Sequence, residues 1–254
     1  MKKILISLIL LSSTAAFGSL EKGLVIAKKM EAANNGYVGE TSTMRLVLID
    51  SSGKQIEREM EGNTSELKNV DKTIMKFQKP ADVKGTKLLT WAHKNKDDDQ
   101  WLYLPSLRRV KRINSRSRGS SFMGSEFSYE DLGSQSIDKY TFNLKGTKKV
   151  DSMDTWVLER VSKNKSSYSK VIMYVSKKYL AAVKSEYYNK RKELLKVAIF
   201  SEFKKYTVKK KSFYRSNKIF MTNIQNKKKS IFTWENRKIG MKLSSRKFNK
   251  NSLK

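Results

Sequence analysis

The stretch DDDQWLYLPSLRRVKRINSRSRGSSFMGSEFSYEDL, residues 97–132, holds two strand-like segments and then loses the strand pattern. Residues 100–104 are aromatic and aliphatic in a way that favours a strand. Pro105 predicts a turn or a sheet edge, because it cannot donate to a strand ladder, and residues 107–113 follow as another strand. Beyond them serine, glycine and charged residues break the alternation, and we expect a short helix within residues 122–132.

Segments of the same kind recur along the chain at about ten-residue spacing, separated by asparagine, glycine, lysine and serine. In residues 41–50, Met44, Leu46 and Leu48 fall on one face of a strand and Arg45 on the other. The remaining predicted strands are 55–63, 70–78, 86–93, 140–145, 155–162, 168–176, 181–188, 194–206, 218–224 and 230–239.

These elements predict a mainly β fold of the α+β class, built on one large antiparallel sheet. One helix is expected in residues 19–36, where apolar residues recur at helical spacing before Asn-Asn-Gly. No crossover helices of the length that parallel strands need are visible between the strands. No linker or repeat divides residues 19–254, so we expect a single domain. The sheet must curl to avoid exposed edges, with the N-terminal helix and the short helical insertion covering it.

Residues 1–18 have the order of a secretory signal peptide. Lys2 and Lys3 form a short basic region, an apolar run follows, and Ala16-Phe17-Gly18 offers small residues for cleavage after Gly18. A buried N-terminal helix is the alternative. The signal predicts export to the periplasm as a soluble protein. The chain has no cysteine, so it carries no site for lipidation at the cleavage point and no disulfide.

The chain is strongly basic, with 54 Lys and Arg against 24 Asp and Glu, for a net charge of +30. Such a balance suggests a polyanionic partner. The expected export argues against nucleic acid and favours transient contact with anionic membrane. The alternative is a lysine-rich composition that only decorates the surface, because the lysines are spread along the chain.

The residues that could support catalysis or metal binding do not form a recognisable site. His93 is the only histidine, and no nucleophile-base arrangement surrounds it. Asp97, Asp98 and Asp99 are consecutive, unlike the spaced ligands of a calcium loop. No phosphate-binding glycine motif is present. We therefore expect no enzyme activity, no metal site and no cofactor.

A dense cationic run lies in residues 108–118. Arginine binds phosphate in bidentate fashion, so the run could dock onto anionic lipid headgroups or an acidic partner. The alternative is internal ion pairing with Glu126, Glu130 and Asp131. The candidate docking residues are Arg108, Arg109, Lys111, Arg112, Arg116 and Arg118.

Aromatic and aliphatic residues cluster near the same stretch and could contact an apolar ligand. Trp101 and Tyr103 share one strand face, and Trp91 is expected on the paired strand. In a curved sheet such residues either fill the core or line a cavity, and the sequence leaves both open. The candidate lipid-binding residues are Met44, Leu46, Leu48, Leu89, Trp91, Trp101, Tyr103, Phe122 and Phe127.

The wording of several segments closely resembles the outer-membrane lipoprotein-sorting protein family, the LolA-like periplasmic carriers. The resemblance covers most of the chain beyond residue 18, with high lysine content and Glu126, where the family often has Asp, as departures. The matching words are QWLYLPSLRRVKRI (100–113), SFMGSEFSYEDL (121–132), FQKPADVKGTKLLTW (77–91), SSYSKVIMYV (166–175) and KIFMTNIQNKKKSIFTW (218–234).

The resemblance implies an incomplete antiparallel barrel with helices as a lid over an apolar cavity. It further implies a periplasmic carrier of lipid or lipoprotein acyl chains that is linked with an RND-type transporter of the inner membrane. A different hypothesis stays open: an envelope adaptor with a filled core that binds anionic polymers or a partner protein through its basic surface.

Overall fold

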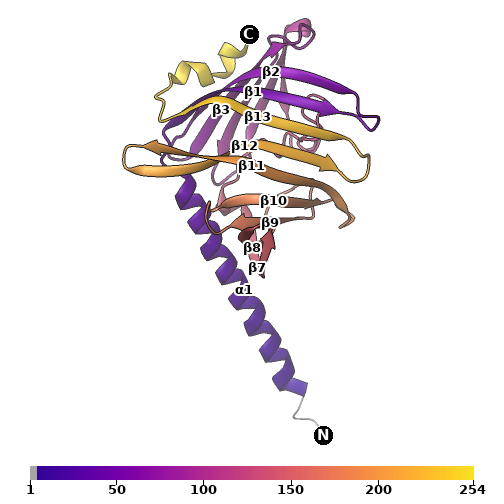
Figure 1. Ribbon diagram of the computed structural model, residues 1–254, viewed down its shortest axis with the longest axis vertical. Coiled ribbons are helices and arrows are strands. Elements are labelled where there is room, and N and C mark those ends of the chain that lie inside the picture. The colour runs from indigo at the N-terminus through magenta and orange to yellow at the C-terminus, as the bar shows by residue number, and fades with distance from the viewer. Residues whose placement is uncertain (1–4) are drawn as a thin grey trace.

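The computed structural model describes residues 5–254, with side chains from Gly18 onward. It contains one long helix, α1 (Leu5–Asn34), and thirteen strands within the described residues (Figure 1). The strands are β1 (Gly39–Ile49), β2 (Gln55–Ser65), β3 (Val70–Lys79), β4 (Lys87–His93), β5 (Asp99–Leu104), β6 (Arg109–Ile113), β7 (Tyr140–Val150), β8 (Met153–Ser162), β9 (Lys170–Ser176), β10 (Ala181–Tyr188), β11 (Leu194–Val208), β12 (Lys211–Asn223) and β13 (Lys229–Ile239).

All thirteen strands form one antiparallel sheet in the order β6-β5-β4-β3-β2-β1-β13-β12-β11-β10-β9-β8-β7. Most neighbours in the sheet are neighbours in sequence, and the pairing of β1 with β13 joins the two series. The outer strands β6 and β7 do not pair with each other, so the sheet curves without closing (Figure 1). The expected fold, a large curved antiparallel sheet with an N-terminal helix, is confirmed.

Helix α1 crosses the open side of the curved sheet. At Gly23 the helix lies so close to β7 that an added Cβ would stand 2.5 Å from the Phe142 carbonyl oxygen. Ile26 and Ala27 of the helix are buried, and the Lys211 ammonium donates to the Ala32 carbonyl at the C-terminal end of the helix, 2.6 Å away. The lysine satisfies a carbonyl that a helix end leaves without an intrahelical partner.

The helix begins well before residue 19, where it was predicted to start, and runs on past the sheet (Figure 1). The expected signal peptide covers residues 1–18, of which residues 1–4 lie outside the described residues. The signal peptide therefore stays a prediction. Among the described helices, none combines the length and the hydrophobicity needed to cross a membrane.

The short helix expected within residues 122–132 is wrong, because this segment is a loop of turns. We call residues 114–136 the crossing loop, since they connect β6 and β7, the two outer strands of the sheet. Met123 and Gly124 have positive φ angles of 50° and 78°, which no α-helix accepts. Ser125 Oγ donates to the Phe122 carbonyl, 2.7 Å away, in the kind of local bond that competes with helix formation.

Several strand boundaries also differ from the prediction; β7, for example, runs to Val150 rather than to residue 145. Residues Pro105–Leu107 form a 3-10 turn and Arg108 is left-handed, so β6 begins at Arg109. Strand β12 begins at Lys211 rather than at residue 218, because β11 and β12 are joined by a tight turn at Lys209. Lys209 and Lys210 form the tip of this hairpin.

The C-terminal strap, residues 241–254, covers the outer face of the sheet. Its two short 3-10 helices, Ser245–Phe248 and Lys250–Leu253, bury Phe248 and Leu253 almost completely. These side chains pack with residues of β4 and β5, and the Trp91 indole N–H donates to the Phe248 carbonyl, 2.9 Å away. Strands β4 and β5 are therefore covered on both faces.

Candidate functional site

A cavity of about 620 Å³ lies between α1, the end of the crossing loop and the inner face of the sheet. Most of the strand residues on its wall belong to β7–β12, and residues of β1–β4 and β13 complete it. Its size is typical of pockets that bind small organic ligands. Small residues, Ala182 and Ser185, lie on the wall among larger apolar side chains and leave room there. The larger apolar residues on the wall include Met30, Phe142, Met173, Phe200 and Ile219.

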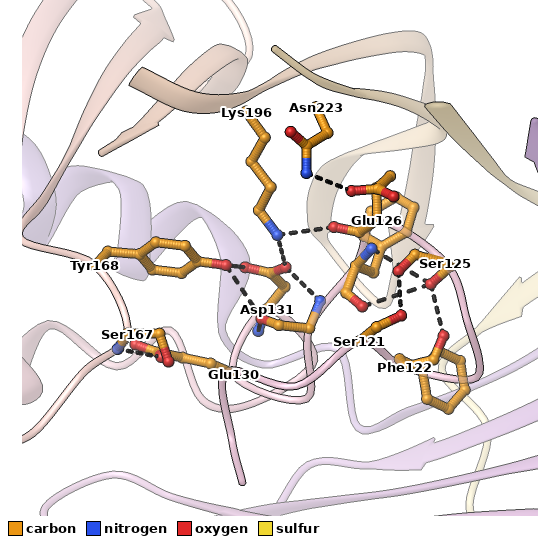
Figure 2. Close-up of polar contacts among 12 residues, drawn as sticks. Ser121, Phe122, Ser125, Glu126, Glu130, Asp131, Ser167, Tyr168, Lys196 and Asn223 are labelled. Atoms are coloured by element: carbon orange, nitrogen blue, oxygen red, sulfur yellow. Dashed lines mark hydrogen bonds and ion pairs between the residues drawn. The ribbon is translucent and has the colours of Figure 1, made fainter. Parts of the chain in front are cut away.

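A buried ion pair fixes the crossing loop beside this cavity. The ammonium of Lys196, on β11, lies 2.6 Å from an Asp131 carboxylate oxygen. The two side chains are 5% and 6% exposed. The Tyr168 hydroxyl donates to the other Asp131 oxygen, 2.9 Å away, and Lys196 also donates to the Glu126 carbonyl at 2.8 Å (Figure 2). Burial raises the pKa of the Tyr168 hydroxyl, which keeps it protonated as a donor.

Two further carboxylates of the crossing loop are held by neutral donors. The Asn223 amide donates to Glu126, 2.7 Å away, and the backbone N–H of Ser167 donates to Glu130, also at 2.7 Å (Figure 2). The Ser166 hydroxyl is a second donor to Glu130. These carboxylates anchor the loop to β9, β12 and their neighbouring turns, which is a structural role.

At one side of the cavity, the Arg160 guanidinium of β8 lies on the wall. It stands 4.4 Å from the centre of the Tyr140 ring and donates a hydrogen bond to the Gln135 side-chain oxygen. Its Nε is buried and makes no hydrogen bond. The hydroxyl of Ser136, on the same wall, is also buried and makes no hydrogen bond. Polar groups therefore interrupt the apolar wall at this position.

Near the C-terminal end of α1, a second polar group lines the cavity. Arg215 donates to the carbonyl and side-chain oxygens of Asn34, the last residue of the helix, and burial lowers the pKa of its guanidinium. Asp71 of β3 has a buried oxygen with no hydrogen bond. Burial raises the pKa of the Asp71 carboxyl to about 6, and the negative charge of Glu66 contributes.

The nine predicted lipid-binding residues fall into three places. Phe127 lies on the cavity wall. Met44, Leu46 and Phe122 are buried in the main core, and Leu48 packs against that core. These four lie in the core because the crossing loop, which carries Phe122, covers the inner face of the sheet beside Met44, Leu46 and Leu48.

The other four, Leu89, Trp91, Trp101 and Tyr103, form a separate cluster on the outer face under the C-terminal strap. We expected Trp91, Trp101 and Tyr103 to share one face of paired strands. The strand register, in which Leu89 faces Trp101, agrees with this. The face they share is opposite to the one that lines the cavity, so they do not contact the cavity.

The predicted docking cations lie along and around the outer strand β6. Arg112 forms an ion pair with Asp99 at 2.5 Å, and half-buried Arg118 forms one with Asp97 at 3.1 Å. The suggested pairing of this run with the acids of the crossing loop is wrong, because those acids have other partners. The cations that are exposed and form no ion pair with a described residue are Arg108, Arg109, Lys111 and Arg116.

Sequence reasoning missed most of the cavity wall, including Arg160, Ala182 and Ile219. These residues belong to strands that were predicted. Alternation along a strand assigns each residue to one of two faces, but it does not say which face lines a cavity. Small residues at facing positions, such as Ser185 paired with Ala198, were the available signal that this part of the sheet leaves space.

Comparisons with known proteins agree with this architecture. A family model described as an uncharacterized protein matches residues 69–254. An outer membrane lipoprotein-sorting protein domain from Vibrio parahaemolyticus is 37% identical, with 92% of this chain and 99% of that chain covered and a TM-score of 0.88. A DUF1329 family protein from Desulfovibrio piger is 27% identical, with 93% and 99% covered and a TM-score of 0.87. No curated protein matches the chain.

The fold extends to more distant structures. A LolA superfamily protein from Nitrosomonas europaea is 18% identical over 91% of this chain and 98% of its own, with a TM-score of 0.71. That identity is informative about the fold alone. From the Vibrio match and the shared curved sheet, the chain belongs to the outer-membrane lipoprotein-sorting protein family and has the LolA-like fold.

Proposed function

We propose that this protein is a periplasmic carrier that binds the acyl chains of a lipid or lipoprotein and moves them across the envelope. The observation that carries the proposal is the cavity of about 620 Å³, with its largely apolar wall beneath α1. Each methylene transferred into such a wall contributes about 0.8 kcal/mol. Binding and release of this kind need no covalent chemistry.

Helix α1 is proposed to act as the lid. It covers the cavity with Ala27 and Met30, and its contacts with the sheet are concentrated where Gly23 meets β7 and where Asn34 meets Arg215. A lid held at few points opens at lower cost than an element that is built into the sheet. Opening would admit the acyl chain from a donor membrane or partner.

Export by the expected signal peptide would place the carrier in the periplasm. An inner-membrane transporter of the RND type is the proposed donor or acceptor, as the family resemblance suggests. The unpaired cations Arg108, Arg109 and Lys111, beside the exposed Leu107, would support transient docking onto anionic membrane. The same exposed cations favour the second candidate, an adaptor that binds anionic polymers or a partner protein.

Native mass spectrometry of the protein purified from its own periplasm, followed by organic extraction, tests the carrier directly. We expect a bound acyl-chain species in the wild type. The variant Ala182→Trp, which fills the cavity, should lose most of it. Ala81→Trp, at an exposed position, is the matched control and should retain the wild-type load.

A ligand-free wild type that stays unchanged after incubation with membrane lipids would contradict the carrier and favour the adaptor. The adaptor also requires binding that fails when Arg108, Arg109 and Arg112 are changed to Glu. The carrier predicts that the same triple variant still takes up a neutral lipid, because these side chains do not line the cavity.

A further inference from the structure

Two hydrogen-bond donors on the cavity wall have no partner in the protein; the unpartnered Asp71 oxygen on the same wall is an acceptor. The Arg160 Nε and the Ser136 Oγ are both buried, and neither forms a hydrogen bond with a described residue. Buried polar groups in folded proteins are almost always hydrogen-bonded, so two orphans on one cavity wall require a physical explanation. Ser136 follows directly after Gln135, whose side-chain oxygen accepts a hydrogen bond from Arg160.

The arginine is held in a fixed position. Arg160 pairs across the sheet with Phe142 on β7 and Val171 on β9, and both of these neighbours line the cavity. Its guanidinium stacks on the Tyr140 ring at 4.4 Å, and one terminal nitrogen donates to Gln135. This stacking and hydrogen bonding restrict the side chain and leave its Nε without a hydrogen-bond partner.

No carboxylate neutralises this guanidinium. Among the described residues Arg160 forms no ion pair within 4.0 Å. Nearby acids have other partners: Asp131 pairs with Lys196, Asp98 pairs with Lys139, and Glu130 accepts from hydroxyl and backbone donors. Glu31 of α1, also on the wall, accepts from the Ile137 backbone N–H at 3.4 Å and forms no ion pair with a described residue. A partly buried cation without a counter-charge is costly, and an anionic ligand would remove that cost.

We infer that Arg160 and Ser136 bind the anionic headgroup, a phosphate or a carboxylate, of an amphiphile whose acyl chain occupies the apolar part of the cavity. The inference rests on the proposed carrier function and specifies its cargo. Arginine donates to such oxygens through charge-assisted hydrogen bonds, and the serine hydroxyl supplies a further donor. The apolar side chains Phe142 and Val171 beside Arg160 would receive the first part of the acyl chain.

The test compares two probes that share a palmitoyl-glycerol body: 1-palmitoyl lysophosphatidic acid, which carries a phosphate, and 1-monopalmitoylglycerol, which does not. Both are titrated below their micelle-forming concentrations by calorimetry. We expect the wild type to prefer the phosphate-bearing probe by about tenfold or more, as a charge-assisted contact provides. In Arg160→Gln most of this preference should be lost, with monopalmitoylglycerol binding unchanged.

Because the whole chain is basic, a control for general charge is needed. Arg191→Gln removes one positive charge at an exposed turn far from the cavity wall and should keep the full preference. Arg160→Lys keeps the positive charge but lacks Nε, so it should retain only part of the preference for the phosphate-bearing probe. Ser136→Ala should reduce it by about threefold. Thermal unfolding of each variant verifies that the fold is intact.

Equal preference in the wild type and Arg160→Gln, with both probes bound, would overturn the headgroup site and leave the carrier standing. Binding of neither probe would overturn both. Titration with inorganic phosphate separates the two sources of the anion. If inorganic phosphate does not displace the bound lysophosphatidic acid, the result supports a lipid headgroup. If the protein binds inorganic phosphate tightly and rejects both lipids, the result overturns the lipid headgroup site.

Discussion

The two halves of this sheet have the same strand pattern but different surroundings. In β1–β6, the crossing loop packs Phe122 and Tyr129 into the core on the inner face, and the C-terminal strap covers the outer face of β3–β6. The inner face of β7–β12 supplies most of the strand residues on the cavity wall, with a smaller share from β1–β4 and β13, and α1 covers it. Chain segments outside the sheet therefore decide whether a strand face becomes core or cavity wall.

This difference gives the halves different mechanical roles. The half covered on both faces holds many large side chains in close contact, and such a core stays rigid. The half beneath α1 also contributes buried core residues, such as Leu158 and Val175, but leaves the cavity open, so it can accept a ligand without displacing them. The pair Asp131–Lys196 joins the two, because it connects the crossing loop to β11 at 2.6 Å.

Breaking that pair should have the largest effect on stability. Asp131→Asn leaves the Lys196 ammonium buried without a counter-charge, and we expect a loss of about 3–5 kcal/mol in the free energy of unfolding, measured by urea denaturation. The double variant Asp131→Leu with Lys196→Met should recover most of the loss, because no unpaired charge is left buried.

Arg191→Gln is the control for this experiment, since its ion pair with Glu193 is largely exposed and should contribute less than about 1 kcal/mol. A loss in Asp131→Asn as small as that of the control would mean that the crossing loop is held by its apolar residues alone. The two halves would then be coupled by packing rather than by this ion pair.

The C-terminal strap offers a change confined to the packed half. Phe248→Ala should lower the free energy of unfolding by about 3 kcal/mol, because a fully buried aromatic side chain leaves a cavity against Leu89 and Trp101. Acyl-chain binding should be unchanged, since these residues lie on the outer face. Lys247→Ala, exposed on the same turn, is the control; reduced acyl binding in Phe248→Ala alone would show that the outer face communicates with the cavity.

The strap also shows where the sequence was informative and where it was not. Alternation placed Trp101 and Tyr103 on one face correctly, because the side-chain period of a strand is local. It did not say which face the cavity would occupy, because the strap that covers these residues lies far away in sequence. The buried neighbours Leu88 and Leu89 were the signal, since consecutive apolar residues indicate a strand covered on both faces.

For the candidate site the sequence was less informative. The strands that carry Arg160 and Lys196 were predicted, but their charges gave no reason to place them inside the molecule. Only the crossing loop, which brings Asp131 and Ser136 to the inner face, gives those cations their surroundings. This loop was predicted to contain a helix, and its many side-chain to backbone hydrogen bonds are difficult to foresee without the fold.

The smallest effect we predict concerns Asp71, which belongs to the packed half but lines the cavity. Burial and, to a smaller extent, the negative charge of Glu66 raise its pKa from 3.8 to about 6, against the opposing positive charge of Lys94. The folded state therefore binds the proton more tightly than the unfolded state does. It follows that this group favours folding at low pH, and that its contribution is lost as the pH rises from about 4 to 6.

Urea denaturation of the wild type and Asp71→Asn between pH 4 and pH 7.5 measures this contribution. The wild type should lose about 1–2 kcal/mol relative to the variant as the pH rises, after allowance for solvent screening. Asp154→Asn, at an exposed position, should follow the wild type. An Asp71→Asn curve parallel to that of the wild type would mean that water reaches this carboxylate freely. A bound acyl chain should exclude that water, so loading the protein with lipid should enlarge the pH-dependent difference if the cavity is the binding site.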